Sequence, residues 1–135
     1  MPETPHPLLS RLVGMRLASV QFVLNDYVRL HFESNALDGE MPILDCFAWP
    51  RIEVRGRVWA EADAGYGDVM RRLAPGDVLE VVEVPGHGMR IVLDTGALII
   101  DPRLDEVVVE IALLNMGDGG WGVWRPGDHP FAHLR

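Results

Sequence analysis

The segment MRIVLDTGALII, residues 89–100, contains Asp94-Thr95-Gly96 after an apolar stretch, a pattern typical of the catalytic loop of an aspartic protease. Those enzymes bring two such loops together so that two carboxyl groups share a proton. The matching segment of this chain carries Glu33-Ser34-Asn35 instead, so two copies of Asp94 would have to come from a homodimer. An acidic residue in a β-turn explains both segments, and we predict that Asp94 lies at an exposed turn.

His129 and His133 are four residues apart, a spacing that places two metal ligands on one face of a helix. No third ligand has a matching spacing, although Asp118 or Asp128 could serve. The alternative is a solvated C-terminal segment. We favour that alternative and expect neither a metal ion nor a cofactor.

Gly117, Gly119 and Gly122 satisfy the Gly-x-Gly-x-x-Gly pattern of dinucleotide-binding loops. Such a loop is followed by a helix, a second parallel strand and an acidic residue about twenty positions later. Only 13 residues follow Gly122, and two of them are prolines. We therefore predict a glycine-rich loop between strands.

Cys46, in the segment ILDCFAW, has neither a neighbouring histidine nor the glycine that marks a catalytic cysteine. We predict a buried thiol among Leu44, Phe47 and Trp49. His31 and His87 are interpreted as surface histidines. No residue is assigned a catalytic role.

Arg29 and Arg90 occupy matching outward positions in two similar segments of the chain. Two such guanidinium groups, with His31 nearby, could bind a carboxylate or a phosphate in a bidentate manner. The alternative is an ion pair between each arginine and an acidic residue of a neighbouring strand. We favour the ion pairs and keep the ligand-binding interpretation open.

The charged residues are unevenly distributed among types, because all 12 basic residues are arginines and 20 residues are acidic, for a net charge of -8. Without lysine there is no Schiff base, no pyridoxal-phosphate attachment and no phosphate-loop lysine. We expect no clustered basic face, and therefore weak nonspecific affinity for nucleic acids. A basic protein is the more natural partner.

At 135 residues, the chain suits a single domain, residues 1–135, that buries roughly 70% of its unfolded surface. The single cysteine cannot form an intramolecular disulfide. We find no secretory leader and no apolar run approaching the ~20 residues that span a bilayer. A cytoplasmic protein without membrane contact is the simplest expectation.

Residues 8–37 and 69–98 align without gaps at an offset of 61, which indicates an internal repeat. Each copy is predicted to contain a short helix, a strand with apolar residues three apart, a turn, a clearly alternating strand and a further turn into a third strand. The three-residue spacing predicts a β-bulge or a strong twist in the first strand. The identical pairs are Arg11/Arg72, Leu12/Leu73, Val20/Val81, Val23/Val84, Arg29/Arg90, Ala36/Ala97 and Leu37/Leu98.

The alternating strands define the expected core. Inward positions in the two copies are Val28, Leu30 and Phe32, and Met89, Ile91 and Leu93. Residues 51–60 and 106–114 are predicted as further strands, with Val107, Val109, Ile111 and Leu113 buried and Glu106 and Glu110 on the other face. The sum of eight or nine strands predicts an α+β fold, mainly antiparallel β, with a barrel-like or curved sheet, two short helices and an approximate internal two-fold repeat.

Residues 115–135 form a Gly/Pro/Trp-rich C-terminal tail. Its aromatic residues are predicted either to fold back over the core or an edge strand or to anchor a partner protein. The candidate partner-binding residues are Trp121, Trp124, Arg125 and Phe131.

The repeated pattern in Leu12 to Leu37 and Leu73 to Leu98 is a strand, a tight turn, an alternating strand, an acid, a hydroxyl, Gly or Asn, and Ala-Leu. It resembles small bacterial, mainly actinobacterial, proteins of unknown function. Those proteins often carry a glutamate on the following strand, for which Glu110 is the nearest match, without the tryptophan expected close after it. The resemblance implies an acidic partner or immunity-type protein and carries over no catalytic residue.

Two functions are compatible with these observations. The leading interpretation is a noncatalytic domain that binds a partner protein or a second copy of itself through its acidic surface and aromatic tail. The alternative is a small-ligand-binding protein or a hydrolase, with a pocket between the two repeats and Arg29, His31, Arg90 or Asp94 on its wall. A concave pocket with convergent polar groups would favour the alternative.

Overall fold

The computed structural model describes residues 7–24, 26–34, 41–84, 86–117 and 120–134, and all elements below belong to that part of the chain. Ten antiparallel strands form one sheet there. They are β1 (Arg16–Val23), β2 (Tyr27–Glu33), β3 (Ile43–Cys46), β4 (Arg51–Val54), β5 (Arg57–Trp59), β6 (Gly76–Val84), β7 (Gly88–Leu93), β8 (Gly96–Ile100), β9 (Ala112–Asn115) and β10 (Trp121–Trp124). A seven-residue helix, α2 (Tyr66–Arg72), one helical turn, α1 (Pro7–Ser10), and two 3-10 turns, η1 (Leu104–Glu106) and η2 (His129–Phe131), complete the fold.

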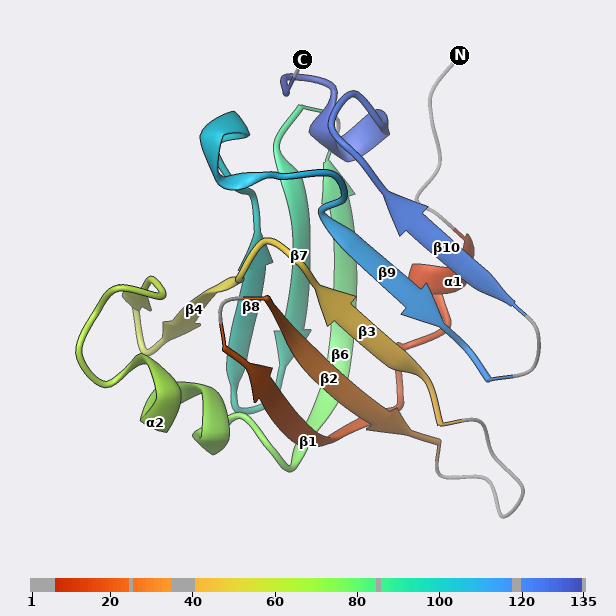
Figure 1. Cartoon of the computed structure of the whole chain (residues 1–135). Helices are drawn as coiled ribbons and strands as arrows, with labels where there is room; N and C mark the ends of the chain where they lie inside the picture. Colours follow the sequence, from red (N-terminus) through yellow and green to blue (C-terminus); the bar gives the residue numbers. More distant parts are fainter. Residues whose placement is uncertain (1–6, 25, 35–40, 85, 118–119, 135) are drawn as a thin grey trace.

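The strand order is β10-β9-β3-β2-β1-β6-β7-β8-β4-β5. We call the first five strands of this order the β2 half and the last five the β7 half. The sheet bends where β1 meets β6, so that the two halves lie one in front of the other (Figure 1). The prediction of a mainly antiparallel sheet is confirmed. The sheet is not closed into a barrel, because β10 and β5 remain edges, and one of the two expected helices is a single four-residue turn.

The hairpins β1–β2 and β6–β7 have the same register. Every pair in β6–β7, from Val78 with Leu93 to Val84 with Gly88, lies 61 positions beyond the corresponding pair in β1–β2. The register shifts in both hairpins, between Leu17 and Ser19 and between Val78 and Glu80. The predicted bulge is confirmed for the first spacing, from Leu17 to Val20 and from Val78 to Val81, because an extra residue returns residues three apart to one face. The second spacing, from Val20 to Val23 and from Val81 to Val84, has regular pairing, so its residues lie on opposite faces.

The offset of 61 does not continue into the third strand. Leu44 pairs with Leu30 in the β2 half, and Leu98 pairs with Ile91 in the β7 half. Leu98 therefore corresponds to Leu44, not to Leu37 as the ungapped alignment predicted. Residues 36 and 37, on which that part of the alignment depended, lie outside the described residues.

The hairpins β4–β5 and β9–β10 each join the half of the sheet that does not contain the strand preceding them in the chain. The hairpin β4–β5 follows β3 in the chain but joins β8, whereas β9–β10 follows β8 but joins β3. The strand order is symmetric about the junction of β1 with β6. Each of the strands β1 to β5 lies as far from this junction on one side as the strand numbered five higher lies on the other side. At the centre, Arg16 faces Asp77, the residue 61 positions further along.

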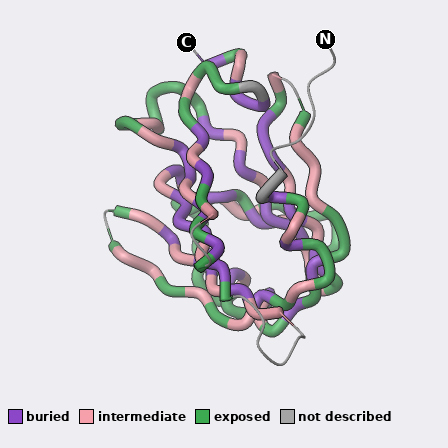
Figure 2. Tube along the Cα trace, turned by 90° about the vertical axis from the view of Figure 1, so that its right-hand side faces the viewer, coloured by how far each residue is buried: buried purple, intermediate pink, exposed green. Residues whose placement is uncertain are grey.

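One hydrophobic core lies between the halves. Buried residues alternate with intermediate and exposed ones along much of the chain trace (Figure 2). The predicted alternation is confirmed in both central strands, since Val28, Leu30 and Phe32, and Met89, Ile91 and Leu93, are all buried. The core is completed from α1, α2 and the turns that follow them, by Leu9, Leu12, Tyr66, Met70 and Leu73.

Residues 51–60 form a hairpin and not the single predicted strand. Arg55 and Gly56 adopt φ angles of 53° and 78°, which are the left-handed values of a two-residue type I′ turn. Strands β4 and β5 are antiparallel neighbours joined by this turn, and Val54 pairs with Arg57. The turn reverses the chain in the middle of a segment that otherwise has strand propensity.

The predicted strand 106–114 is also shorter than expected. Residues 104–106 form the 3-10 turn η1, and β9 begins only at Ala112, where β3 and β10 are available on both sides. Ile111 is buried as predicted, but Val109 is 66% exposed. Strand propensity alone does not extend β9, because Val108 and Val109 have no neighbouring strand to pair with in the described structure.

Candidate functional site

Asp94, Thr95 and Gly96 each have a structural contact at the exposed turn between β7 and β8. The Asp94 carboxylate accepts a hydrogen bond from the backbone N–H of Asp77 at 2.9 Å, and the Thr95 hydroxyl donates to the backbone oxygen of Leu73 at 2.8 Å. A Cβ on Gly96 would lie 2.8 Å from the backbone oxygen of Glu53, so glycine allows β4 to approach. The prediction that Asp94 lies at an exposed turn is confirmed.

The same turn forms one wall of an open groove of about 900 Å³. The β4–β5 hairpin, α2 and β7 also contribute lining residues. We call it the arginine groove. Its lining residues are Glu53, Val54, Arg55, Gly56, Arg57, Trp59, Arg72, Arg90, Val92, Leu93, Asp94, Thr95, Gly96 and Ala97.

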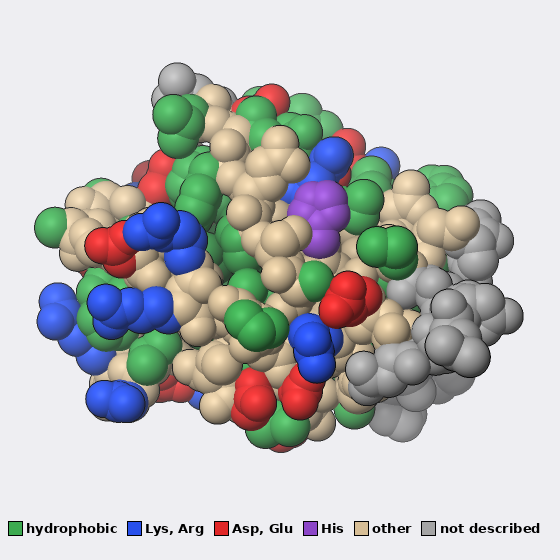
Figure 3. Space-filling model, turned by 90° about the horizontal axis from the view of Figure 1, so that it is seen from below, with side chains coloured by type: hydrophobic (Ala, Val, Ile, Leu, Met, Phe, Trp, Pro, Cys, Tyr) green, Lys and Arg blue, Asp and Glu red, His purple; other side chains and the backbone are tan. Residues whose placement is uncertain are grey.

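Arginine side chains gather on this side of the molecule, around β4, β5 and α2 (left in Figure 3, blue). The groove contains four guanidinium groups and two carboxylates, of which Glu53 pairs with Arg90. Arg57 lies over the Trp59 ring, 4.5 Å from its centroid. The guanidinium groups of Arg55 and Arg72 have no hydrogen-bond or ion-pair partner among the described residues.

The groove therefore has an excess of positive charge in a chain whose net charge is -8. This corrects the expectation that the chain has no clustered basic face. The arginines come from segments that are separate in the sequence: 51–60, α2 and β7. The sequence therefore contains no run of basic residues that would predict the groove. The available signal was Gly56 in the middle of segment 51–60, because glycine readily adopts the positive φ that a type I′ turn requires.

Arg29 and His31 lie elsewhere. Arg29 and Asp45 face each other on β2 and β3 and form a bidentate pair, with distances of 2.8 Å and 3.0 Å. The hydrogen bonds that Arg29 donates to Asp45 raise the pKa of Arg29 against the opposing effect of burial. His31 is half-buried on β2. Of the three predicted ligand-binding residues, only Arg90 lines the groove.

Burial accounts for the state of two titratable groups in the core. Cys46 is 0% exposed, as predicted, and burial together with the charge of Asp45 raises the pKa of its thiol. Burial also raises the pKa of Tyr66, whose hydroxyl donates to the backbone oxygen of Pro50 at 2.5 Å. Neither group is poised as a nucleophile or base near neutral pH.

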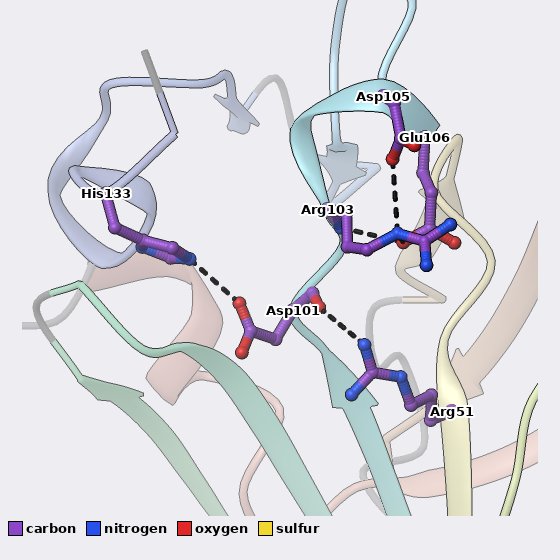
Figure 4. A network of polar contacts seen from close by, with 6 residues as sticks. All are labelled: Arg51, Asp101, Arg103, Asp105, Glu106 and His133. Carbon is purple, nitrogen blue, oxygen red and sulfur yellow. Dashed lines mark hydrogen bonds and ion pairs between the residues drawn. The ribbon is translucent and has the colours of Figure 1, made fainter.

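His133 contacts a carboxylate, not a second histidine. Its Nε2 lies 3.0 Å from Oδ1 of Asp101, whose backbone oxygen accepts a hydrogen bond from Arg51 (Figure 4). The side chain of His129 is outside the described part of the structure. Among the described residues, no group of three or more His, Cys, Asp or Glu side chains is placed to hold a metal ion.

The C-terminal tail belongs to the sheet. Trp124 on β10 is 2% exposed and donates from Nε1 to Glu83 at 2.6 Å, and Phe131 is 0% exposed. Their burial makes both unavailable to a partner, which corrects their assignment as partner-binding residues. Trp121 is 64% exposed on the edge strand, and Arg125 is exposed 3.8 Å from Glu110.

In the part of the chain that the structure describes, no helix is long and apolar enough to cross a membrane. No protein-family model, curated protein or solved structure matches this chain. The evidence for function therefore comes from the lining residues of the arginine groove and their contacts.

Proposed function

We propose that this protein is a noncatalytic binding domain and that the arginine groove is its binding site for an anionic ligand. The observation that carries the proposal is that four arginines line one open groove, two of them without a hydrogen-bond or ion-pair partner among the described residues. Guanidinium groups bind carboxylates and phosphates with directed pairs of hydrogen bonds. Ligand binding would supply the missing partners of Arg55 and Arg72.

The contacts of the Asp94 turn support a noncatalytic role. All three residues of the motif have structural contacts: to Asp77, to Leu73 and by close approach to β4. These contacts hold the wall of the groove in place. The turn thus serves the site as a scaffold and not as a source of reacting groups.

We also infer that the two halves derive from one repeated unit that spans five strands. The shared register, the two matching bulges and the reversible strand order support this inference. The seven extra residues between β2 and β3 explain why the ungapped similarity does not match the pairing of the third strand. On this view, the arginine groove is a specialised feature, because the hairpin β9–β10, which corresponds to β4–β5, contains no arginine.

Binding of a small anion tests the proposed function. We expect tripolyphosphate to shift the backbone amide resonances of β4, β5 and the Asp94 turn. Replacing Arg55, Arg57 and Arg72 together by Gln should weaken binding by about tenfold or more, since each removes a charge-assisted hydrogen bond. Raising the salt concentration should weaken binding to the wild-type protein more than to this variant.

Arg103→Gln is the matched control, because Arg103 is exposed at the N-cap of η1 and does not line the groove. We expect it to bind tripolyphosphate as the wild type does. Equal binding by the triple variant and the wild type would rule out the groove as the site. Resonance shifts confined to other strands would do the same.

A second candidate function is favoured by one observation, the 64% exposure of Trp121 on the edge strand β10. An exposed tryptophan beside unpaired strand groups is a typical anchor for a partner or a second copy. If β10 mediates self-association, Trp121→Ala should shift the protein to the monomer in sedimentation experiments. A wild-type protein that sediments as a monomer at all concentrations would exclude self-association through β10.

A further inference from the structure

From the position of the arginine groove at a free strand edge, we infer that its ligand is an extended acidic peptide segment of a partner protein, bound as an added strand along β5. This inference rests on the proposed function and specifies the ligand. β5 is the last strand in the sheet order and pairs with β4 alone in the described structure. Addition of a strand to such an edge is a common mode of peptide recognition.

The hairpin geometry identifies the backbone groups that would bind. In a two-residue hairpin, the residues that flank the turn, Val54 and Arg57, face each other as a hydrogen-bonded pair. The next pair, Glu53 with Val58, is then a non-hydrogen-bonded pair. The N–H and C=O groups of Val58 consequently point away from β4, toward the free edge. Val58 is 45% exposed.

The side chains around this edge set the chemistry of the added strand. Arg57 and Trp59 lie on one face of β5, and Val58 lies on the other, because side chains alternate along a strand. Arg55 and Arg72 lie on the same groove as Arg57. A strand with acidic residues at every second position would place its carboxylates toward these arginines and its other side chains next to Val58.

A second copy of β5 is a poor occupant of this edge. Two paired hairpins would gather four guanidinium groups, Arg55 and Arg57 of each copy, at one short edge, and like charges close together repel. Arginines at an edge thus prevent self-pairing while they attract an acidic strand. The groove also has a single tryptophan, Trp59, whose ring is covered by Arg57, whereas sites for single-stranded nucleic acid use several free aromatic faces.

The test compares two peptides of equal composition and charge, one of alternating Glu and Val and one of paired Glu-Glu-Val-Val repeats. We expect the alternating peptide to bind more tightly by about fivefold or more, because only it presents all its carboxylates on one face. Binding should protect the Val58 amide of the wild-type protein from hydrogen exchange. Equal affinities, unchanged Val58 exchange, or tighter binding of a thymidine oligonucleotide would each overturn the inference.

Val58→Pro separates strand addition from simple charge attraction. Proline removes the one edge donor and is tolerated where the N–H faces solvent. We expect about threefold to tenfold weaker binding of the alternating peptide, the effect of one hydrogen bond, with tripolyphosphate binding unchanged. Val58→Thr, which keeps the N–H, should bind the peptide as the wild type does. If Val58→Pro binds both probes normally, strand addition is wrong and the anion site stands; if the triple arginine variant also binds both normally, the proposed function fails too.

Discussion

Arg29 and Arg90 occupy the same position in the pairing of their hairpins, but their surroundings differ. Arg29 faces Asp45 across β2–β3 and is held by two hydrogen bonds. Arg90 faces Ile99 across β7–β8, so its carboxylate partner, Glu53, comes from the next strand, β4. In the β2 half, Arg29 is paired with a carboxylate of the adjacent strand β3. In the β7 half, Arg90 is paired with a carboxylate of β4 and lines the groove.

The hairpins β4–β5 and β9–β10 also differ in the residues they carry. The β4–β5 hairpin of the β7 half has a two-residue turn and carries Arg55 and Arg57. Its counterpart, β9–β10, has a longer glycine-containing connection and carries Trp121 at the edge. The shared pairing therefore specifies the scaffold, while the turns and the residues opposite Arg29 and Arg90 specify the binding chemistry. Experiments that compare matched positions in the two halves test this division.

The largest effects should come from matched core positions. Leu30→Ala in β2 and Ile91→Ala in β7 each remove a fully buried aliphatic side chain. We expect each to lower the free energy of unfolding by about 2–5 kcal/mol, in a single transition, because both residues belong to one core. Urea unfolding followed by circular dichroism measures both values.

Leu79→Ala is the control, since Leu79 lies on β6 but is 57% exposed. Its effect should stay within about 0.5 kcal/mol. Two separate unfolding transitions, or a loss confined to one core variant, would show that the halves are independent units and that the comparison has no common scaffold.

The core was predictable from the sequence because strand alternation is local. Val28 to Phe32 and Met89 to Leu93 carry one apolar residue in every two, and the burial of that face follows from the pattern alone. The bulges were predictable for the same reason. The pairing of the third strand was not predictable, because seven more residues separate β2 from β3 than separate β7 from β8. A local pattern also contains no information about which distant strand a segment will pair with.

The candidate site was harder to predict than the core. Arg90 was identified from its repeated position, but Arg55, Arg57 and Arg72 converge only because β4–β5 crosses to the other half and α2 packs beside it. The burial of Trp124 and Phe131 also depends on this exchange, since β10 pairs beyond β9. Such convergence depends on long-range pairing, which residue spacing does not reveal.

A smaller effect is expected from the two carboxylates that hold Arg29 and Arg90. The Asp45 side chain is 12% exposed and that of Glu53 is 32% exposed. Asp45→Ala should lower the free energy of unfolding by about 1.5–3 kcal/mol, because it removes a charged hydrogen-bond partner and leaves Arg29 uncompensated. Glu53→Ala should cost about 1 kcal/mol or less in the solvated groove.

Glu53→Ala should also strengthen tripolyphosphate binding, since it frees Arg90 and removes a negative charge from the groove. Calorimetric titration of the two variants measures this effect, and Asp45→Ala serves as the control without a groove contact. Equal stability losses in the two variants would mean that the surroundings of Arg29 and Arg90 are equivalent, which would remove the main distinction between the halves.

The smallest effect concerns pH. Cys46 in the β2 half pairs with Val28 as Ile100 in the β7 half pairs with Met89. Burial raises the pKa of the Cys46 thiol above its ordinary value of 9.0, so the folded protein keeps a proton that the unfolded chain has lost at higher pH. The stabilisation is therefore fully present below about pH 9 and declines above it, by up to about 1.4 kcal/mol per pH unit.

Cys46→Ala isolates this contribution. The variant is less stable at neutral pH because it leaves a small cavity, but its stability should decline less steeply between about pH 9 and 10. Tyr66 has an ordinary pKa of 10.0, also raised by burial, so a decline above that pH should remain in the variant. Urea titrations at several alkaline pH values measure both slopes. Identical slopes in the wild type and Cys46→Ala would mean that the thiol is accessible to solvent in the native state, and the β2 half would then be more open than its buried residues indicate.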